Sequence, residues 1–354
     1  MLPLLLLACT GPEAAPSPEP TGPTSPLGTG EPDSVEWTYI LGEEEKVSDP
    51  RDIGFDGEGR LWIANRVDDR TFIVTDPGTD EQDHERRKDG YAEHFMEETM
   101  ALSFDGDVQF GSCGESRNTY NDRYPPNDFM GPVLWSTDLE IFAAQNPEGL
   151  GSHLDMLHES PNCMGIAWER ANVYWVFDGQ NDTIVRYDFA EDHDVGQDYH
   201  GDGLIHRLSE PEVAREPDVP SHMMIDPATG LLYVADTGNG RILWIDTQSG
   251  EKGDNLRVSA EPVEEYAWWD GAAWGVLVEG LDRPSGLAVG GERVWVAEYG
   301  TGRILEYGLD GQLLVSLDTG LGAETLHGIE LGPDGKLWVV DNVGTTVWRI
   351  DPVE

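Results

Sequence analysis

Apolar and polar residues alternate with a period of two along most of the chain from Val35 onward. The alternating runs are short and rich in Val, Ile, Leu, Trp and Tyr, and turns containing Asp-Gly, Gly-Asn or proline separate them. Because successive side chains of a β-strand point to opposite faces, this pattern predicts strands with one face in a core. No long stretch has the 3.6-residue period of an amphipathic helix. We therefore predict an all-β protein.

One segment of this pattern recurs six times. The first strands of the copies begin near Ile53, Leu102, Ile166, Met223, Leu287 and Ile329, which spaces them 42 to 64 residues apart. Short strands repeated at this period are typical of propeller blades, so we predict a six-bladed β-propeller over residues 35–354. The last copy ends after its third strand. We expect the strand-like segment Val35–Leu41 to supply the fourth strand of the last blade and so close the ring.

Blade topology sorts the insertions between strands into two groups. In a blade of four antiparallel strands A to D, with A innermost, the D–A and B–C connections lie on one face, here called the first face. The A–B and C–D connections lie on the opposite, second face. We assign the insertions 113–131, 146–162 and 209–219 to the first face, and 76–90, 188–203 and 247–271 to the second.

The segment Tyr233-Val-Ala-Asp-Thr-Gly-Asn-Gly-Arg-Ile242 resembles the repeats of NHL-repeat propellers of the SMP-30/NHL-like superfamily. The resemblance covers the chain from about Val35 onward, and it implies the six-bladed fold without implying one activity, since such propellers include binding scaffolds, lactonases, lyases and other hydrolases. The NHL-type lyase that cleaves peptidyl hydroxyglycines binds zinc through His residues directly after Pro at several A-strand starts. Here only His327 stands at the equivalent place, and Ser221 and Ser285 replace the others. That zinc site is therefore not implied.

The SMP-30-like lactonases offer a second comparison, because a Glu, an Asn and an Asp hold a divalent cation in their channel. Asp52, Asn162 and Asp236 are the matching candidates here, but the Glu near the start is absent. Several polar residues stand at or near the starts of A strands and are candidates for ligand contact: Arg51, Asn162, Ser221 and Ser285.

The N-terminus resembles an export signal. Residues 1–9 form a short apolar run that ends in Leu6-Leu7-Ala8-Cys9, similar to a bacterial lipobox in which the cysteine becomes acylated. Residues 10–34 are rich in Pro, Gly, Ser, Thr and Glu and are predicted to form a mobile tether. We expect a lipid-anchored propeller exported to the bacterial cell envelope, periplasmic or at the cell surface. An ordinary secretory signal and a chance apolar start are the alternatives.

The charge of the chain limits its partners. The 68 acidic residues outnumber the 22 basic residues and give a formal charge of -46. The negative electrostatic field of such a chain repels phosphate groups, so we expect no nucleic acid partner and no membrane contact except through the lipid anchor. No Gly-rich loop joins a strand to a helix, so no nucleotide cofactor is expected. The expected partner is an unknown protein, glycan or small-molecule ligand, and we expect a monomer.

Two of the three cysteines are expected to meet. Cys113 ends the second strand of the second copy and Cys163 begins the first strand of the third copy, so both fall on the first face in adjacent blades. Because export exposes a protein to oxidising conditions, we predict a disulfide between them. Two buried thiols are the alternative.

Histidines and carboxylates form a candidate transition-metal or ligand site on the first face. Imidazole nitrogens and carboxylate oxygens are the usual protein ligands of zinc when they converge. The candidate residues lie in the 151–162 insertion and at the A-strand starts: His153, Asp155, His158, His222, His327 and Asp52. The alternative is that the side chains of the insertion only hydrogen-bond it to the propeller rim.

A second cluster consists of carboxylates in the 188–203 insertion. The candidate calcium ligands are Asp192, Asp194, Asp198 and Asp202. Such a density of oxygen ligands favours Ca²⁺, and a solvated acidic loop is the alternative. Our strand assignment places this loop on the second face, away from His153. One site built from both clusters would require a different assignment.

Two hypotheses for function follow. The first is a ligand- or protein-binding scaffold that uses its first face and carries a structural divalent cation, Ca²⁺ or Zn²⁺. The second is a metal-dependent hydrolase or lyase, similar to a lactonase, with its site at the channel mouth. The sequence contains no Gly-x-Ser-x-Gly motif, and no catalytic residue is assigned.

Overall fold

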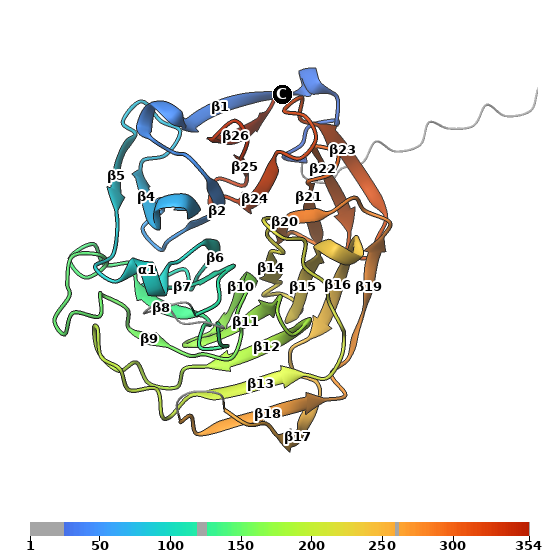
Figure 1. Ribbon diagram of the computed structural model, residues 1–354. Coiled ribbons are helices and arrows are strands. Elements are labelled where there is room, and N and C mark those ends of the chain that lie inside the picture. The colour runs from blue at the N-terminus through green and yellow to red at the C-terminus, as the bar shows by residue number, and fades with distance from the viewer. Residues whose placement is uncertain (1–24, 119–125, 259–261, 354) are drawn as a thin grey trace, which may run out of the picture.

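The strands form six blades around a central axis, which confirms the predicted β-propeller (Figure 1). The computed structural model describes residues 25–118, 126–258 and 262–353. The proposed lipobox cysteine, Cys9, lies outside the described residues. Within the described residues, no helix is long and apolar enough to span a bilayer.

Each blade has four strands, ordered outward from the channel. Blade 1 contains β2 (Pro50–Phe55), β3 (Leu61–Asn65), β4 (Arg70–Thr75) and β5 (Asp83–Arg87). Blade 2 contains β6 (Thr99–Phe104), β7 (Gln109–Gly114), β8 (Val133–Ser136) and β9 (Asp155–Met156). Blade 3 contains β10 (Cys163–Arg170), β11 (Val173–Asp178), β12 (Thr183–Asp188) and β13 (Leu204–Leu208).

The second half of the ring repeats this order. Blade 4 contains β14 (Met223–Ile225), β15 (Leu231–Asp236), β16 (Arg241–Asp246) and β19 (Trp274–Glu279). Blade 5 contains β20 (Pro284–Gly290), β21 (Arg293–Glu298), β22 (Arg303–Gly308) and β23 (Leu313–Asp318). Blade 6 contains β24 (Leu326–Leu331), β25 (Leu337–Asp341), β26 (Thr346–Pro352) and β1 (Val35–Leu41). In the part of the chain that the structure describes, the helical segments are α1 (Ala92–Phe95) and short 3-10 turns at Pro32–Ser34, Glu43–Glu45, Arg66–Asp68 and Thr237–Asn239.

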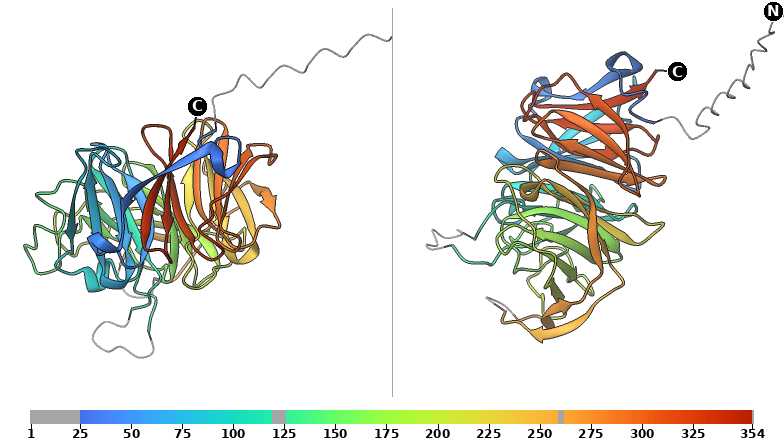
Figure 2. Two further views of the ribbon diagram at one scale, coloured as in Figure 1. Left: turned by 90° about the horizontal axis from the view of Figure 1, so that it is seen from above. Right: turned by 90° about the vertical axis from the view of Figure 1, so that its right-hand side faces the viewer.

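The N-terminal strand closes the ring as predicted. Strand β1 pairs antiparallel with β26, with Val35 opposite Pro352, and the side views show the C-terminal end beside this strand (Figure 2). Pairing the two chain ends in one blade removes the open edges that a linear array of sheets would leave. The folded part also begins before Val35, because Leu27 is completely buried against Trp295 and Leu317. The segment from residue 25 therefore belongs to the domain rather than to the predicted tether.

Large aromatic side chains fill the spaces between blades. Trp62, Trp175 and Trp338 are buried at corresponding positions of three blades. The indole N–H of Trp62 donates to Asp56 at 2.7 Å and that of Trp175 donates to Glu169 at 2.8 Å, so the buried donors are satisfied. These three tryptophans therefore act as packing residues.

Two connections depart from the simple repeat. The insertion of blade 4 forms a hairpin, β17 (Glu251–Asn255) and β18 (Glu265–Asp270), and β18 pairs in parallel with β13 of blade 3. The insertion therefore extends the sheet of the neighbouring blade (Figure 1). In blade 2, the two-residue strand β9 lies inside the 146–162 insertion that we assigned wholly to the first face. That assignment is wrong for the residues before β9, which belong to the C–D connection.

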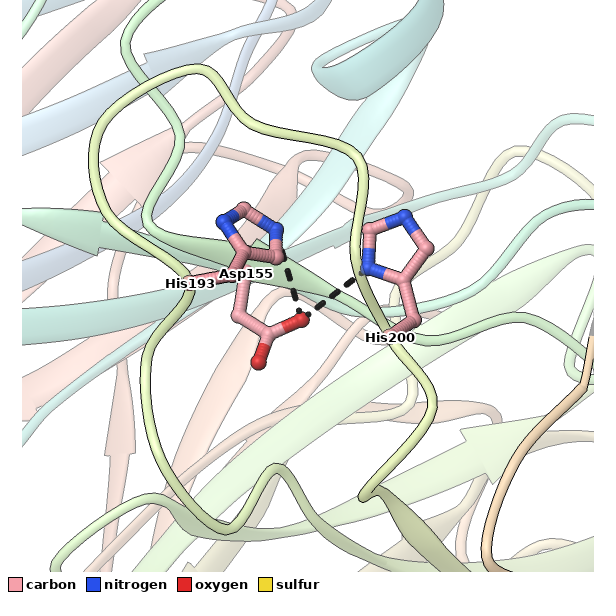
Figure 3. Close-up of side chains that lie close together, drawn as sticks. All are labelled: Asp155, His193 and His200. Carbon is pink, nitrogen blue, oxygen red and sulfur yellow. Dashed lines mark hydrogen bonds and ion pairs between the residues drawn. The ribbon is translucent and has the colours of Figure 1, made fainter.

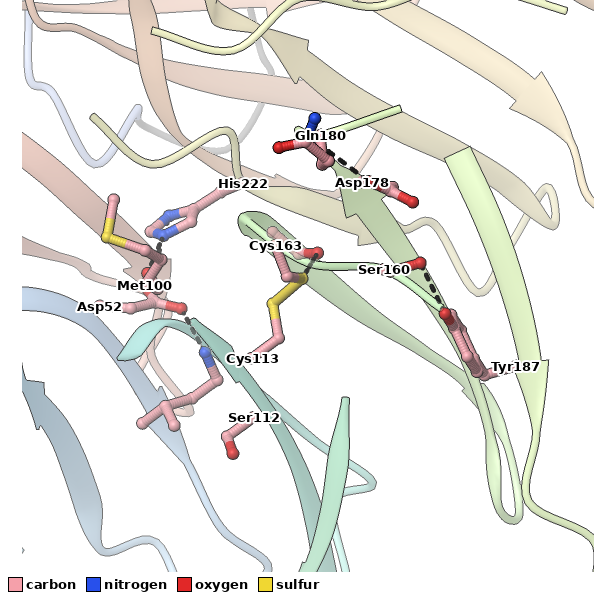
Figure 4. The surroundings of a disulfide bond; sticks show 12 residues. Asp52, Met100, Ser112, Cys113, Ser160, Cys163, Asp178, Gln180, Tyr187 and His222 are labelled. Atoms are coloured by element: carbon pink, nitrogen blue, oxygen red, sulfur yellow. Dashed lines mark hydrogen bonds and ion pairs between the residues drawn. A yellow bond between two sulfur atoms is a disulfide. The ribbon is translucent and has the colours of Figure 1, made fainter. Parts of the chain in front are cut away.

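The predicted disulfide is present. Cys113 and Cys163 are bonded, with their Cα atoms 5.6 Å apart, and the bond joins the end of β7 to the start of β10 (Figure 4). Both residues are buried in one hydrophobic cluster shared by blades 2 and 3. The bond therefore fixes these two blades to each other beside the channel residues Asp52 and His222.

Candidate functional site

Three side chains that could hold a metal ion converge at the rim between blades 2 and 3. Asp155 comes from β9, and His193 and His200 come from the 189–203 loop between β12 and β13. One ligand atom of each lies within 4.8 Å of the others (Figure 3). The loop reaches blade 2 through backbone hydrogen bonds, from His193 N–H to Leu154 O at 3.2 Å and from Gly196 N–H to His153 O at 2.8 Å.

The spacing of the three ligand atoms suits a transition metal. Oδ1 of Asp155 lies 3.2 Å from Nδ1 of His200 and 3.5 Å from Nε2 of His193. Ligand atoms about 2.0–2.2 Å from a tetrahedral zinc ion lie roughly 3.3–3.6 Å from one another. Nε2 of His193 is buried and has no hydrogen-bond partner among the described atoms, so it is left free to bind an ion. The three residues therefore fit a zinc-like ion, with a fourth coordination position open.

Burial sets the electrostatics of this cluster. The three side chains are only 1–4% exposed, and burial raises the pKa of Asp155 to about 8. The imidazole of His193 opposes this shift, whereas the carboxylates of Asp202 and Asp192 add to it. A buried acid close to further acids is stabilised in its charged form when a cation binds beside it.

The cluster is part of a longer row of imidazoles. The ring centroids lie 5.2 Å apart for His153 and His193, and 5.0 Å apart for His193 and His200. The row continues from His200 to His158 at 6.0 Å and from His158 to His94 at 6.4 Å. Five of the nine histidines of the chain thus lie within one region.

His153 and His158 lie near the cluster without joining it. The ring nitrogens of His153 contact Leu150 O at 2.9 Å and Gln197 O at 3.0 Å, and burial lowers its pKa to about 3. His158 stacks on Phe129 with ring centroids 3.5 Å apart. His153 thus links the insertion to the neighbouring loop, as the alternative interpretation of this insertion anticipated.

The sequence analysis missed His193 and His200 as metal-ligand candidates because it placed their loop on the opposite face from Asp155. The loop lies against Leu154 and His153, so that separation is wrong. No local signal marks the missing D strand of blade 2, because β9 has two residues and residues 151–163 are all buried rather than alternately buried and exposed.

The predicted calcium loop does not gather its aspartates. Asp192, Asp194 and Asp198 are exposed, and the carboxylate of Asp202 accepts a hydrogen bond from Glu191 N–H at 3.3 Å. In the described part of the chain, the four carboxylates do not form a metal-ligating group of three. The loop instead contributes two imidazoles to the rim cluster.

The remaining predicted metal candidates lie in the central channel. Oδ1 of Asp52 lies 3.5 Å from Nδ1 of His222, although the two residues come from opposite blades (Figure 4). His327 contacts Arg51 at 3.5 Å, and burial together with the charge of Arg51 lowers the pKa of His327 well below its usual range. The six predicted residues therefore form two separate groups, one at the rim and one in the channel.

The channel is crossed by ionic contacts on the first face. Arg51 donates to the backbone oxygen of Asp218, and Arg66 pairs with the carboxylate of Asp218 at 2.9 Å. The N–H of Asp218 donates to Glu115 at 2.9 Å. Because both arginines belong to blade 1 and Asp218 precedes blade 4, the 215–218 segment spans the channel mouth.

The other predicted ligand contacts are occupied by structural hydrogen bonds. The Oγ of Ser221 bonds to Thr237 at 2.7 Å, and the Oγ of Ser285 donates to Leu326 O at 2.8 Å. Both serines are fully buried. The side-chain amide of Asn162 donates to Gln180 at 2.9 Å. These side chains hold neighbouring strands and turns together at the first face.

Comparisons with known proteins support the fold. No family model and no curated protein matches the sequence. Among solved structures, the chain is similar to virginiamycin B lyase from Staphylococcus aureus, at 12% identity and a TM-score of 0.51, over 90% of this chain and 99% of that one. It is also similar to an auxiliary nutrient binding protein from Bacteroides ovatus, at 11% identity and a TM-score of 0.52, over 90% and 77% of the two chains. A luciferin-regenerating enzyme matches at 11% identity and a TM-score of 0.52, over 90% and 96%. At these identities the likeness shows the propeller fold alone.

Proposed function

We propose that this protein is an exported, lipid-anchored propeller that acts as a ligand- or protein-binding scaffold and holds a structural divalent metal ion at its rim. The convergence of Asp155, His193 and His200 carries the proposal. An ion at this point would join the 189–203 loop of blade 3 to strand β9 of blade 2. The loop would then be fixed by coordination as well as by its two backbone hydrogen bonds.

The donor set favours a zinc-like metal over calcium. Two imidazole nitrogens and one carboxylate oxygen suit borderline transition metals, whereas calcium takes six to eight oxygen ligands. The near-complete burial of the three side chains favours a structural role, since a catalytic ion needs a position that substrate can reach.

Export and lipid anchoring are part of the proposal. The Cys113–Cys163 disulfide supports an oxidising compartment, and the Leu-Ala-Cys sequence at Cys9 supports acylation. We propose that the domain is monomeric and touches the membrane only through its anchor. Replacing Cys9 by Ala should release the protein from the membrane fraction and abolish incorporation of a labelled fatty acid.

The metal site can be tested directly by titration. The full-length protein, stripped with chelator, should bind one equivalent of Co²⁺ with the visible absorption of a tetrahedral site, and Zn²⁺ should displace it. His193→Ala and His200→Ala should each weaken binding at least tenfold. His84→Ala, at an exposed position on β5, serves as the matched control. Absence of zinc binding, or binding that both cluster variants leave unchanged, would overturn the assignment.

A hydrolase or lyase is the second candidate function. It is favoured by one observation, the open fourth position that three protein ligands leave on a tetrahedral ion. Zinc-loaded protein should then turn over lactones or esters, and the activity should disappear in His193→Ala. Metal binding without turnover of such substrates would favour the scaffold.

A further inference from the structure

A cavity of about 170 Å³ occupies the central channel below the contacts that span its mouth. It runs from Asp52 and His222, at or just before the starts of the innermost strands, to Gly106 in the A–B turn of blade 2. The cavity therefore extends toward the second face. Since one water needs roughly 10–15 Å³ by this measure, the space accommodates a small organic molecule rather than a single ion.

Two carboxyl groups lie in the wall of this cavity. Asp52 is held in place by hydrogen bonds from Ile53 N–H at 2.7 Å and from Leu102 N–H at 2.8 Å. Glu330, on β24, also lines the cavity, and among the described residues neither a hydrogen bond nor a positively charged group acts on its carboxyl group. Burial raises the pKa of Glu330 well above its usual range, and the nearby charge of Asp52 raises it further. Glu330 is thus an acid without a partner that faces an open space.

Most of the remaining wall residues are apolar, with Ser103 and His222 as the polar exceptions. Three aromatic side chains, Phe55, Phe104 and Trp168, line the cavity together with Met, Ile and Leu residues. No Lys or Arg is among the lining residues. Aromatic faces attract ammonium groups, and the strongly negative protein concentrates cations near its surface.

The same features argue against a bare metal ion here. Asp52, His222 and Glu330 do not form a group of three converging ligand atoms in the described part of the chain. The apolar lining would also leave most coordination positions of an ion unfilled. An anionic ligand would meet two carboxyl groups and no basic side chain other than the imidazole of His222.

We propose that the channel binds a small organic ammonium compound, with its charged nitrogen at Glu330 and Asp52 and its apolar body against Phe55, Phe104 and Trp168. The inference rests on the proposed function as a ligand-binding scaffold and names the class of ligand. It also places the ligand on the second-face side of the channel, whereas the sequence analysis expected binding at the first face.

Calorimetry with three matched probes tests this assignment on the full-length protein. Benzylammonium should bind, and benzyl alcohol and benzoate, which have the same ring without the positive charge, should bind at least tenfold more weakly. Glu330→Gln, which keeps the size of the side chain, should weaken benzylammonium binding at least tenfold. Glu36→Gln, at an exposed position on the closing strand, is the matched control. Trp168→Leu, at a half-buried wall residue, should weaken binding severalfold through loss of the ring.

The outcomes separate this inference from the metal proposal. Equal binding of benzyl alcohol and benzylammonium, or unchanged affinity in a folded Glu330→Gln variant, would overturn the channel assignment. Zinc titration of the same samples should give one site in Glu330→Gln and none in His193→Ala, while His193→Ala keeps its affinity for benzylammonium. Zinc binding that persists in His193→Ala would count against the rim site, and loss of benzylammonium binding alone in Glu330→Gln would confirm the channel site.

Discussion

The bond between Cys113 and Cys163 should contribute a large share of the stability of the ring. It closes a loop with a sequence separation of 50 residues. In the chain-entropy description, a loop of this length removes about 14 cal/mol/K from the unfolded state, or about 4 kcal/mol at 25 °C. Both cysteines are buried, so their replacement also changes packing between blades 2 and 3. We expect Cys113→Ala/Cys163→Ala to lower the free energy of unfolding by about 3–4 kcal/mol.

Urea denaturation followed by tryptophan fluorescence measures this change. With a urea dependence of about 3 kcal/mol/M, the midpoint should fall by about 1 M in the double variant. Wild-type protein unfolded in the presence of a reductant separates the cross-link from the packing, because it loses the bond and keeps both sulfur atoms. Cys9→Ala is the control, since it removes a cysteine that takes no part in the Cys113–Cys163 bond.

Two results would refute the reasoning. The first is a midpoint within 0.2 M urea of wild type in both the double variant and the reduced protein, which is a change in the free energy of unfolding of less than about 1 kcal/mol at this slope. It would show that the stability of the propeller does not depend on the bond. A large change in the double variant with none in the reduced protein would assign the effect to packing rather than to the cross-link.

Three other measurements test separate parts of the molecule. Leu27→Ala should lower the free energy of unfolding by about 2–4 kcal/mol, because this side chain is fully buried; an unchanged thermal melt would exclude residues 25–34 from the domain. Burial raises the pKa of Glu97 to about 7, so its contribution to stability is lost as the pH rises from about 4.5 to 7. Glu97→Gln should therefore stabilise the protein by about 1–2 kcal/mol at pH 8, with solvent screening included, and leave its stability unchanged at pH 4. Glu36→Gln, at an exposed position on β1, should leave the stability unchanged at both pH values. Zinc at about 100 times its dissociation constant should raise the free energy of unfolding by about 2.7 kcal/mol, and the increase should be absent in His193→Ala.

The fold could be predicted from the sequence because its signals are local. Each blade repeats a period-two pattern and a turn, and the position of each A strand follows from the neighbouring residues alone. Closure by Val35–Leu41 followed from a count of strands in the last copy. The disulfide followed from the strand assignment of the second and third copies, which placed Cys113 and Cys163 on the same face of adjacent blades.

The rim cluster could not be predicted because non-local contacts create it. Strand β9 has only two residues, too few for a visible alternation, and this missing strand shifted the preceding loop to the wrong face. The imidazoles meet Asp155 only because the 189–203 loop leaves its own blade and binds the neighbouring one. The β17–β18 hairpin also pairs with a neighbouring blade, and no feature of its sequence indicates that β13 is its partner strand.

Both candidate sites have the same physical origin. In each, burial raises the pKa of an acid that has no ion pair to Lys or Arg, so its charged form is unfavourable until a cation binds. The neighbouring groups then decide which cation fits. Imidazoles beside Asp155 offer directed lone pairs at the spacing of a metal's ligands, whereas aromatic rings beside Glu330 offer diffuse negative faces around a larger space. Because one site is at the rim and the other in the channel, occupying either should leave the affinity of the other unchanged.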